Sequence, residues 1–441
     1  MKHYDAIIIG GGILGCMAAR NLRRWNITTL LLEKEADICM GITRANSAIV
    51  YAGSDNKPGS LKAELTVRGN REMETLCKEL DVPFSRCGSL LVTYDSGTVA
   101  RLQRKMENGA KNGVPGLQLL TGTEAEAMEP QLAKGVAAAL YAPTTGTVNP
   151  WQLGIAACEN AVQNGAQVLC GREVTGICPT EDGFLVNTDA GAFSCKMVLN
   201  CAGLWADKIQ ELAFAPTVRL EWDSAEYLVF DKYAPKPERV IFLQAAACGK
   251  GITAIPCTEG NLLISGVRKP MGTPFATTVA GLQELHGATK DLLPQVQTGQ
   301  VIRSFGAVRP NPYVEQGGSL PDFCIENPAP GFYSLIGIKT PGLTCANGLG
   351  MLLAEKAAAY LQAEKNPCFD PIRKGIPRTD GEIVCQCEGI SREEIWEAIR
   401  RGATTVEGVK RRVGSGMGPC QGSRCSDAIE RILEEYRNEN G

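Results

Sequence analysis

The chain has 441 residues, of which 44% are hydrophobic, enough to bury a substantial core and to form two or three domains. Its 45 basic and 48 acidic residues give a formal net charge of −3, which excludes the strong positive field of a nucleic-acid-binding or anionic-membrane-binding protein. We therefore expect small molecules and other proteins as partners, and no nucleic acid.

The N-terminus predicts neither a secretion signal nor a transmembrane segment. Met1 leads directly into a strand-like run at residues 4–9, without a charged segment, apolar run and cleavage site. The longest uncharged apolar stretch, residues 6–19, falls short of the roughly 20 residues that span a bilayer. Most of the 18 cysteines are scattered singly, which is typical of reduced thiols rather than of a disulfide framework. We expect a cytoplasmic protein that reaches a membrane only peripherally, through partners.

The first predicted unit is a strand, a helix and a second strand. A strand ending at Ile9 leads into Gly10-Gly-Gly12-Ile-Leu-Gly15, a helix to about residue 22, and a strand at 28–32 followed by Glu33. In a dinucleotide-binding unit the first glycine permits the tight turn, the second admits a pyrophosphate, and the third allows close helix packing. Glu33 is placed to accept hydrogen bonds from ribose hydroxyls. An accidental glycine turn is the minority alternative.

The middle of the chain alternates expected strands and helices, as in an α/β protein with an inserted sheet. Strands are expected at 88–92, 167–170 and 227–230, and helices at 98–111 and 151–164. A buried strand from residue 196 runs into the small-residue turn Ala202-Gly203, which suits a second backbone approach to a cofactor. A last long helix is expected at about 348–363. The stretch 366–382 carries three prolines and is expected to be a linker.

Four cysteines near the end of the chain form two close pairs, Cys385-Gln-Cys387 and Cys420 with Cys425. Both iron–sulfur clusters and structural zinc bind such thiolates. Glycines 414, 416, 418 and 422 surround Cys420 and allow backbone amides to approach cluster sulfides. Helices are expected at 393–401, with a Ser391–Glu394 capping box, from near Thr405, and at 426–436. The C-x-C pair favours an iron–sulfur cluster, and a four-cysteine zinc site is the alternative.

The terminal segment resembles the bacterioferritin-associated-ferredoxin type of [2Fe–2S] domain. The resemblance is carried by Cys385-Gln-Cys387-Glu-Gly389, Gly402-Ala-Thr-Thr405, Gly408-Val-Lys-Arg-Arg412, Gly416-Met-Gly418 and Cys420-Gln-Gly-Ser-Arg-Cys425. It implies that Cys385, Cys387, Cys420 and Cys425 are the ligands of a [2Fe–2S] cluster.

Residues 1 to about 363 resemble the FAD-dependent oxidoreductases of the D-amino-acid oxidase superfamily. The matching motifs are Gly10 to Gly15, Leu32-Glu33-Lys34, Asn46-Ser47, Asn200-Cys-Ala-Gly-Leu-Trp205 and Pro341-Gly-Leu-Thr344. Within that superfamily, Asn46-Ser47 through Pro58-Gly-Ser-Leu-Lys62 and Gly146-Thr-Val-Asn-Pro150 look like L-2-hydroxyglutarate oxidases and anaerobic-type glycerol-3-phosphate dehydrogenases. The anaerobic glycerol-3-phosphate enzymes also carry this terminal cluster domain.

The resemblance implies an α/β fold with a Rossmann-type FAD-binding domain, an inserted mixed-sheet substrate domain and a small helical [2Fe–2S] domain. We expect FAD-binding segments at about 1–80, 145–215 and 330–365, and substrate-domain segments at about 81–144 and 216–329. A linker at 366–382 would then lead into a [2Fe–2S] domain at 383–441.

The resemblance also implies a set of FAD-binding residues. Gly10, Gly12 and Gly15 would hold the pyrophosphate, Glu33 the adenosine ribose and Val174 the adenine region. Gly203 and Gly342 would lie near the flavin. The other expected members of the set are Lys34, Thr43, Arg44, Asn46, Ser47, Ala202, Trp205, Gly337, Leu343 and Thr344.

The catalytic pattern departs from that of the relatives. Where they usually have Ser-Gly-x-x-His-Ala-Gly, this chain reads Ser47-Ala-Ile-Val-Tyr51-Ala-Gly53, so a tyrosine replaces a potential histidine base. Tyr51 is a candidate to donate a hydrogen bond, to relay a proton, or to pack against the isoalloxazine ring. The two histidines, His3 and His286, are expected to be structural or solvated.

Three basic residues are candidates to bind an anionic substrate. Arg309, in Gly306-Ala-Val-Arg-Pro310, resembles the family arginine that meets such a substrate, and a buried structural ion pair is its alternative. Lys339 and Arg268 are further candidates, with a solvated loop lysine and a surface arginine as the alternatives. The windows 221–227 and 265–268 depart from the relatives' pattern, so the substrate is predicted less closely than the cofactor.

These features predict an FAD-dependent dehydrogenase that oxidises a small anionic 2-hydroxy compound, with glycerol 3-phosphate as the first choice. Electrons would pass from FAD through the [2Fe–2S] cluster to an electron-accepting protein subunit, for example a second flavoprotein. One alternative is the oxidation of a 2-hydroxy acid, an amino acid or another amine. A second alternative, of another class, is a non-catalytic flavin and iron–sulfur electron-transfer subunit.

Overall fold

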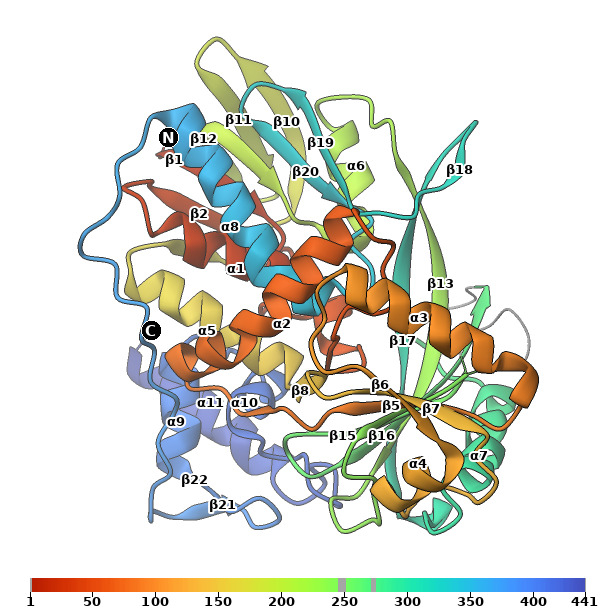
Figure 1. Cartoon of the computed structure of the whole chain (residues 1–441). Coiled ribbons are helices and arrows are strands. Elements are labelled where there is room, and N and C mark those ends of the chain that lie inside the picture. Colours follow the sequence, from red (N-terminus) through yellow and green to blue (C-terminus); the bar gives the residue numbers. More distant parts are fainter. Residues whose placement is uncertain (1, 245–250, 271–274, 441) are drawn as a thin grey trace.

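A computed structural model describes residues 2–244, 251–270 and 275–440, and for residues 267–270 and 440 it describes the backbone alone. Two large sheets, each with its own helices, make up most of the molecule, and a small helical module lies beneath the first of them (Figure 1). Within the described residues, no helix is long and apolar enough to span a membrane.

The first sheet has parallel strands at its centre. Its path is β10 (Val174–Thr180), β11 (Gly183–Thr188), β12 (Gly191–Asn200), β1 (His3–Ile9), β2 (Thr29–Leu32) and β9 (Gln167–Leu169), and β20 (Phe332–Ile336) pairs with β12 and with β19 (Cys324–Ala329). Successive side chains of β1 point to opposite faces. Ala6 and Ile8 pack into the helical core, while Ile7 and Ile9 pack against β10, β11 and Phe332. Burial on both faces explains the continuous apolar run in the sequence.

Four helices cover one face of this sheet. They are α1 (Ile13–Leu22), α2 (Leu61–Leu80), α5 (Pro150–Gln163) and α8 (Gly342–Leu361). Small residues let these helices approach closely. Between α8 and α1, for example, a Cβ added at Gly350 would lie only 2.7 Å from the Met17 carbonyl carbon. The predicted last helix therefore begins at residue 342 rather than 348. Its first turn is packed against α2, where a Cβ at Gly69 would lie 2.0 Å from the Thr344 carbonyl oxygen, and this tertiary contact outweighs weak local propensity.

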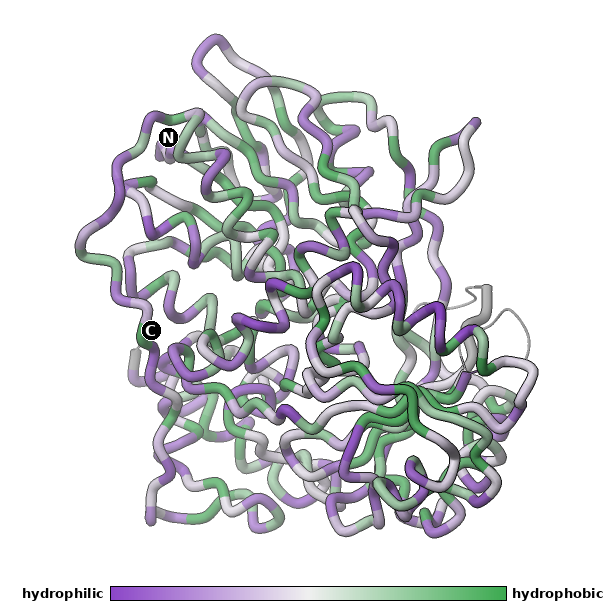
Figure 2. The backbone as a smooth tube through the Cα atoms, in the orientation of Figure 1, coloured by the Kyte–Doolittle hydropathy of each residue, from purple (hydrophilic) through white to green (hydrophobic). Residues whose placement is uncertain are grey.

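The second sheet is mostly antiparallel. Its order is β18 (Gly318–Ser319), β17 (Val301–Val314), β13 (Arg219–Phe230), β16 (Leu262–Pro270), β15 (Thr253–Pro256), β14 (Val240–Leu243), β5 (Ser89–Thr93), β7 (Ala138–Ala142) and β6 (Gln118–Thr121). Three helices flank it: α3 (Val99–Lys111), α4 (Gly122–Met128) and α7 (Val279–Leu292). Figure 2 shows hydrophobic residues concentrated where strands of this second sheet converge. A small sheet of β3 (Ile49–Val50), β8 (Gly146–Val148) and β4 (Phe84–Ser85) and the short helix α6 (Ala206–Glu211) complete the two large bodies.

The C-terminal module contains β21 (Ile383–Cys385), β22 (Ile390–Ser391), α9 (Arg392–Arg400), α10 (Val406–Val413) and α11 (Ser426–Asn440). The predicted capping box is present, because the Ser391 side chain accepts the Glu394 amide and the Glu394 side chain accepts the Ser391 amide. Apolar residues of the three helices form its core together with Cys385 and Cys425. Residues 366–382, which lead into the module, form neither helix nor strand.

The module is held against the first body by buried ion pairs. Asp37, in the loop after β2, accepts hydrogen bonds from Arg411 Nη2 at 2.9 Å and from Arg412 Nη1 and Nη2 at 2.7 and 2.9 Å. Glu159 of α5 pairs with Arg401 at 3.3 Å. On the side of the second sheet, Lys232 lies 3.4 Å from Glu388. The predicted α/β class with an inserted sheet and a small helical terminal module is confirmed.

Candidate functional site

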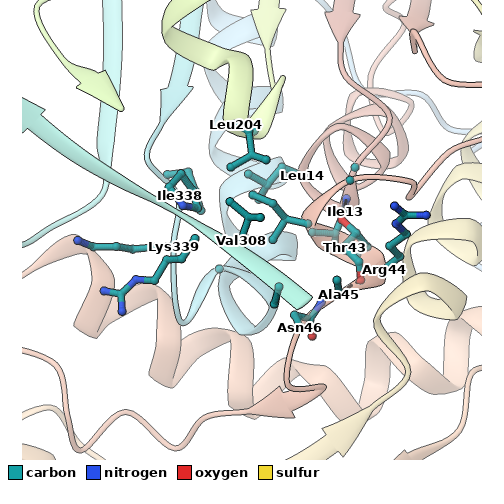
Figure 3. A pocket seen from close by; sticks show the side chains of 18 of the residues that line it. Ile13, Leu14, Thr43, Arg44, Ala45, Asn46, Leu204, Val308, Ile338 and Lys339 are labelled. Atoms are coloured by element: carbon teal, nitrogen blue, oxygen red, sulfur yellow. Dashed lines mark hydrogen bonds between the residues drawn. The ribbon is translucent and has the colours of Figure 1, made fainter. Parts of the chain in front are cut away.

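A cavity of about 660 Å³ is lined by residues of both large sheets. In Figure 3, Leu14, Leu204 and Val308 lie in the middle of the view, with Thr43, Ala45 and Asn46 on one side and Ile338 and Lys339 on the other. The cavity brings together these predicted cofactor-binding residues: Gly10, Gly12, Glu33, Lys34, Thr43, Arg44, Asn46, Ser47, Val174, Ala202, Gly203, Trp205, Gly342 and Leu343. It also brings in Tyr51, Arg309 and Lys339 from the predicted catalytic set.

The glycine-rich turn after β1 forms one end of the cavity. Gly10 has φ +104, and a Cβ there would lie 2.6 Å from the Cys201 carbonyl oxygen. Gly12 is the N-cap of α1 and supplies no capping side chain. Gly15 lies behind the turn, where a Cβ would lie 1.9 Å from the Gly10 carbonyl oxygen. The backbone and the N-terminus of α1 are thus open to an anion, as a pyrophosphate requires.

Glu33 stands at the end of β2 and is 9% exposed. Its Oε2 accepts the Gly11 amide at 2.6 Å and its Oε1 accepts the Glu35 amide at 2.9 Å. Burial raises the pKa of Glu33, and the two amide hydrogen bonds oppose that shift. The neighbouring Lys34 places its Nζ 4.9 Å from the ring centre of Trp205, which is 45% exposed. The carboxylate faces the cavity from a position fixed by the backbone.

The segment around Thr43 is fixed by its own side chains. Thr43 Oγ1 accepts the Ile13 amide at 2.9 Å, at the start of α1. Asn46 donates from Nδ2 to the Thr43 carbonyl at 2.9 Å and accepts the Ala48 amide at 2.8 Å. Ala48 has φ +57, a left-handed conformation that the Asn46 hydrogen bond helps to hold. This wall of the cavity is therefore preformed.

Two of the predicted cofactor residues support the cavity from behind. Thr344 Oγ1 accepts the Tyr51 amide at 3.0 Å and ties α8 to the strand end after β3. Gly337 has φ +70, and a Cβ there would lie 2.5 Å from Pro312 Cβ. With Gly15, these residues lie outside the cavity lining in the described structure.

The cavity wall formed by β13 and β17 differs from the wall around Thr43, because several of its buried polar atoms have no hydrogen-bond partner among the described residues. Arg309 of β17 pairs with Asp223 of β13 in the strand register. Among the described residues, Arg309 Nε and Nη1, Trp222 Nε1 and Asp223 Oδ1 are buried and have no hydrogen-bond partner. All three residues line the cavity. Because an unpaired buried polar group costs about 1–3 kcal/mol, this wall is arranged for a polar ligand, and the guanidinium favours an anionic one.

The other predicted catalytic residues lie in different settings. The Tyr51 ring stacks on Phe242 with ring centres 6.0 Å apart. Lys339 Nζ lies 3.5 Å from Asn311 Oδ1. The backbone of Arg268 is paired with Ala225 in the β16–β13 ladder, and its side chain lies outside the described residues.

Sequence reasoning missed Trp222 and Asp223 as site residues. The signal was present, because the window 221–227 departs from the relatives' pattern. What the sequence lacks is the pairing of β13 with β17, which places Asp223 opposite Arg309.

The four terminal cysteines meet at one end of the C-terminal module. Cys387 Sγ lies 3.5 Å from Cys420 Sγ, and Cys385 Sγ accepts the Gly416 amide at 3.4 Å. Cys425 interacts with Cys385. Gly418 has no room for a side chain, since a Cβ there would lie 2.5 Å from Cys387 Cβ. The predicted thiol set is therefore assembled by the fold.

The thiols differ in their acidity and exposure. The Gly422 backbone amide lowers the pKa of Cys420, whereas burial raises the pKa of Cys425 to about 12, so its thiolate needs a neighbouring cation. No three Cys, His, Asp or Glu side chains within the described ranges gather closely enough for a single metal ion. A two-iron cluster shares four thiolates between two iron atoms, which fits these pairs better than one tetrahedral zinc.

Comparisons with known proteins agree with this geometry. Residues 5–356 match the FAD dependent oxidoreductase family, and residues 383–435 match the BFD-like [2Fe-2S] binding domain. The chain therefore belongs to the FAD-dependent oxidoreductases and carries a [2Fe–2S] domain at its C-terminal end. The predicted enzyme class and both cofactors, FAD and the [2Fe–2S] cluster, are confirmed.

Several individual proteins are similar over most of their length. A glycerol 3-phosphate dehydrogenase of Caloramator mitchellensis is 35% identical, with 98% of this chain and 94% of that protein aligned. An L-2-hydroxyglutarate dehydrogenase of Indibacter alkaliphilus is 28% identical over 80% of this chain and 98% of its own length. The structure of dithionite-reduced L-alpha-glycerophosphate oxidase from Mycoplasma pneumoniae with FAD bound superposes with a TM-score of 0.78 at 25% identity, covering 86% of this chain and 100% of that one.

Proposed function

We propose that this protein is a dehydrogenase that oxidises glycerol 3-phosphate at FAD and passes the electrons through its [2Fe–2S] cluster to an acceptor protein. The observation that carries the proposal is the Arg309 guanidinium in the cavity wall, whose Nε and Nη1 atoms are buried and lack partners among the described residues. A phosphate bound along either edge of the guanidinium takes up one of these two donors together with Nη2. The 35% identity to a glycerol 3-phosphate dehydrogenase supports the choice of this anion over others.

In this proposal the cofactor lies along the preformed wall. The Gly10–Gly12 turn and the start of α1 hold the pyrophosphate, and Glu33 binds the adenosine ribose. Val174 lies beside the adenine, and Ala202, Gly203, Gly342 and Leu343 lie beside the flavin. Their positions in one cavity lining support this assignment.

The substrate lies against β13 and β17. Arg309 binds the phosphate, and Lys339, which lines the same cavity from the loop between β20 and α8, adds a second positive charge. FAD, when bound, accepts a hydride from the substrate carbon. Asp223 takes the hydroxyl proton on Oδ1 as the carbonyl forms, so the hydrogen leaves as one hydride and one proton. Asp223 thus supplies the base that the missing histidine would have provided.

Tyr51 has a positioning role in this scheme. Its backbone amide is held by Thr344 and its carbonyl accepts Asn70 Nδ2 at 3.0 Å. Its ring is fixed against Phe242 and forms part of the cavity wall. We assign it to packing beside the flavin and substrate.

The cluster is the electron exit. Cys387 and Cys420 are half-buried, whereas Cys385 and Cys425 are 1% exposed, so one side of the cluster site faces outward. That arrangement supports one-electron transfer to a partner subunit. The proposal places the enzyme in the cytoplasm, with membrane attachment through that partner, and the described cysteines, all of which are free thiols, support this location.

A 2-hydroxy acid is the second candidate substrate. The 28% identity to an L-2-hydroxyglutarate dehydrogenase over 98% of that protein favours it, and the Arg309 guanidinium would then bind a carboxylate.

Anaerobic bleaching of the bound flavin separates the candidates. The holoenzyme is mixed in a stopped-flow instrument with glycerol 3-phosphate, L-2-hydroxyglutarate or glycine at equal concentrations. We expect rapid bleaching by glycerol 3-phosphate alone. Faster bleaching by L-2-hydroxyglutarate or glycine would replace our substrate, and no bleaching by any of them would favour the non-catalytic electron-transfer subunit.

A further inference from the structure

A second cavity, of about 730 Å³, lies at the junction between the C-terminal module and the first body. One side is formed by the C-terminal half of α2, by the loop that leads into β4, and by α5. The other side is formed by residues 373–378 and by α9 and α10. Neither the flavin chemistry nor the cluster uses this space.

Positive charge dominates the lining of this junction cavity. The lining contains the basic residues Lys78, Arg86, Arg373, Arg378, Arg411 and Arg412 and the acidic residues Glu74, Asp81 and Glu394. Asp37 and Glu159, which pair with the arginines from behind the wall, are not enough to balance the charge. A partly enclosed cavity with excess positive charge attracts anions.

Arg411 and Arg412 each bury an Nε that has no hydrogen-bond partner among the described residues. Its side chain is 5% exposed and donates from Nη2 to Asp37 at 2.9 Å. Arg412 occupies both oxygens of the same carboxylate and places its Nε 4.0 Å from Glu159. Arg411 Nε is buried and has no hydrogen-bond partner in the described part of the chain. One carboxylate therefore serves two buried guanidinium groups, which leaves donor capacity for another anion.

The remaining lining adds an apolar surface. Val82, Phe84, Ile155, Ile376 and Val413 line the same cavity. Arg86 lies over the Phe84 ring with its Cζ 5.1 Å from the ring centre. A volume of this size, with polar groups beside an apolar surface, is typical of small-molecule sites.

We propose that the junction cavity is a second ligand site, which binds a small phosphate-bearing molecule through Arg411 and the surrounding basic side chains. Phosphate matches the planar donor fork of arginine and supplies more than one negative charge. Because the ligand contacts residues of α2 and α10 together, it links the cluster module to the first body. The site does not depend on which substrate the flavin oxidises.

Calorimetric titration with inorganic phosphate, at constant ionic strength and with FAD and cluster bound, tests this site. We expect saturable binding that weakens about tenfold in Arg411→Gln and about threefold in Lys78→Gln, where the lysine is 75% exposed. Arg392→Gln is the matched control, because Arg392 belongs to the same module but pairs with Glu435 away from the cavity. It should bind like the wild type.

Arg309→Gln separates this site from the substrate site. We expect the variant to keep phosphate binding at the junction. Loss of all binding in Arg309→Gln, with full binding in Arg411→Gln and Lys78→Gln, would show that phosphate occupies only the flavin cavity. No saturable binding in the wild type, or binding of succinate but not phosphate, would also overturn the proposal.

Discussion

The two walls of the flavin cavity differ in whether their polar side chains are hydrogen-bonded within the protein. On the wall built from the β1–α1 turn and the Thr43 segment, Glu33, Thr43 and Asn46 each have hydrogen-bond partners within the protein. On the β13–β17 wall, Arg309, Trp222 and Asp223 keep buried polar atoms without partners among the described residues. The first wall is complete before a ligand arrives, and the second is completed by its ligand. Changes in the first should therefore affect cofactor retention, and changes in the second should affect turnover.

The largest expected effect is on the first wall. Gly15→Ala places a Cβ 1.9 Å from the Gly10 carbonyl oxygen, so the β1–α1 turn must move, at a cost of about 4 kcal/mol or more. We expect the variant to purify without FAD, or not to fold. Gly287→Ala, in α7 outside the cavity lining and with no atom within 4 Å of the added Cβ, is the control. A normal flavin content in Gly15→Ala would show that the wall is not rigid.

On the second wall, Arg309→Met should slow flavin reduction by glycerol 3-phosphate about 10³-fold, while FAD content stays unchanged. Loss of a buried charged partner costs roughly 2–5 kcal/mol in binding. Arg303→Met on the same strand is the control, because Arg303 is exposed. Stopped-flow reduction at several substrate concentrations measures both variants. Equal rates in wild type and Arg309→Met would remove Arg309 from the site.

Asp223→Asn should slow flavin reduction about 10²-fold, within the range for loss of a general base. FAD binding should be unchanged, and saturation with substrate should occur at a similar concentration. Asp223→Glu, which keeps the carboxylate, should recover part of the rate, and it distinguishes a lost base from a disturbed pocket. A rate in Asp223→Asn equal to that of the wild type would assign the base to another group.

The smallest expected effect is at the junction with the module. Asp37→Asn should slow reduction of the cluster about tenfold, because two buried arginines lose their carboxylate, while flavin reduction stays normal. Rapid mixing followed by freeze-quench spectroscopy separates the two events. A parallel loss of flavin reduction would show that Asp37 also shapes the cofactor wall.

We also expect docking of the C-terminal module at this junction to depend on pH. Burial opposes ionisation of Asp37, but the hydrogen bonds and charges of Arg412 and Arg411 outweigh it and lower its pKa. The Asp37–arginine contact therefore stabilises the docked module fully above the pKa that the Asp37 carboxyl has in the unfolded chain, about 4. This stabilisation is lost as the pH falls through the lower pKa that Asp37 has in the folded protein. Asp37→Asn should remove this part of the acid sensitivity of module docking.

The first wall was predictable because its signals are local. Gly10 and Gly15 act within one turn, and Glu33 follows the next strand, so spacing alone placed them together. The second wall depends on pairing between distant strands, which is why Asp223 was missed although Arg309 was predicted. The Asp37–Arg411 contact joins residues 374 positions apart and has no sequence signature. The start of α8 was placed six residues late because its packing against α2 is tertiary.

The most direct test of the account is an anaerobic titration of the holoenzyme with glycerol 3-phosphate, followed by flavin absorbance and by electron paramagnetic resonance of the cluster. We predict that the flavin bleaches and that the reduced [2Fe–2S] signal follows in the wild type, and that both changes are about 10³-fold slower in Arg309→Met at the same concentrations. A flavin that stays oxidised in the wild type, or a bleached flavin beside a cluster that remains oxidised, would contradict the account.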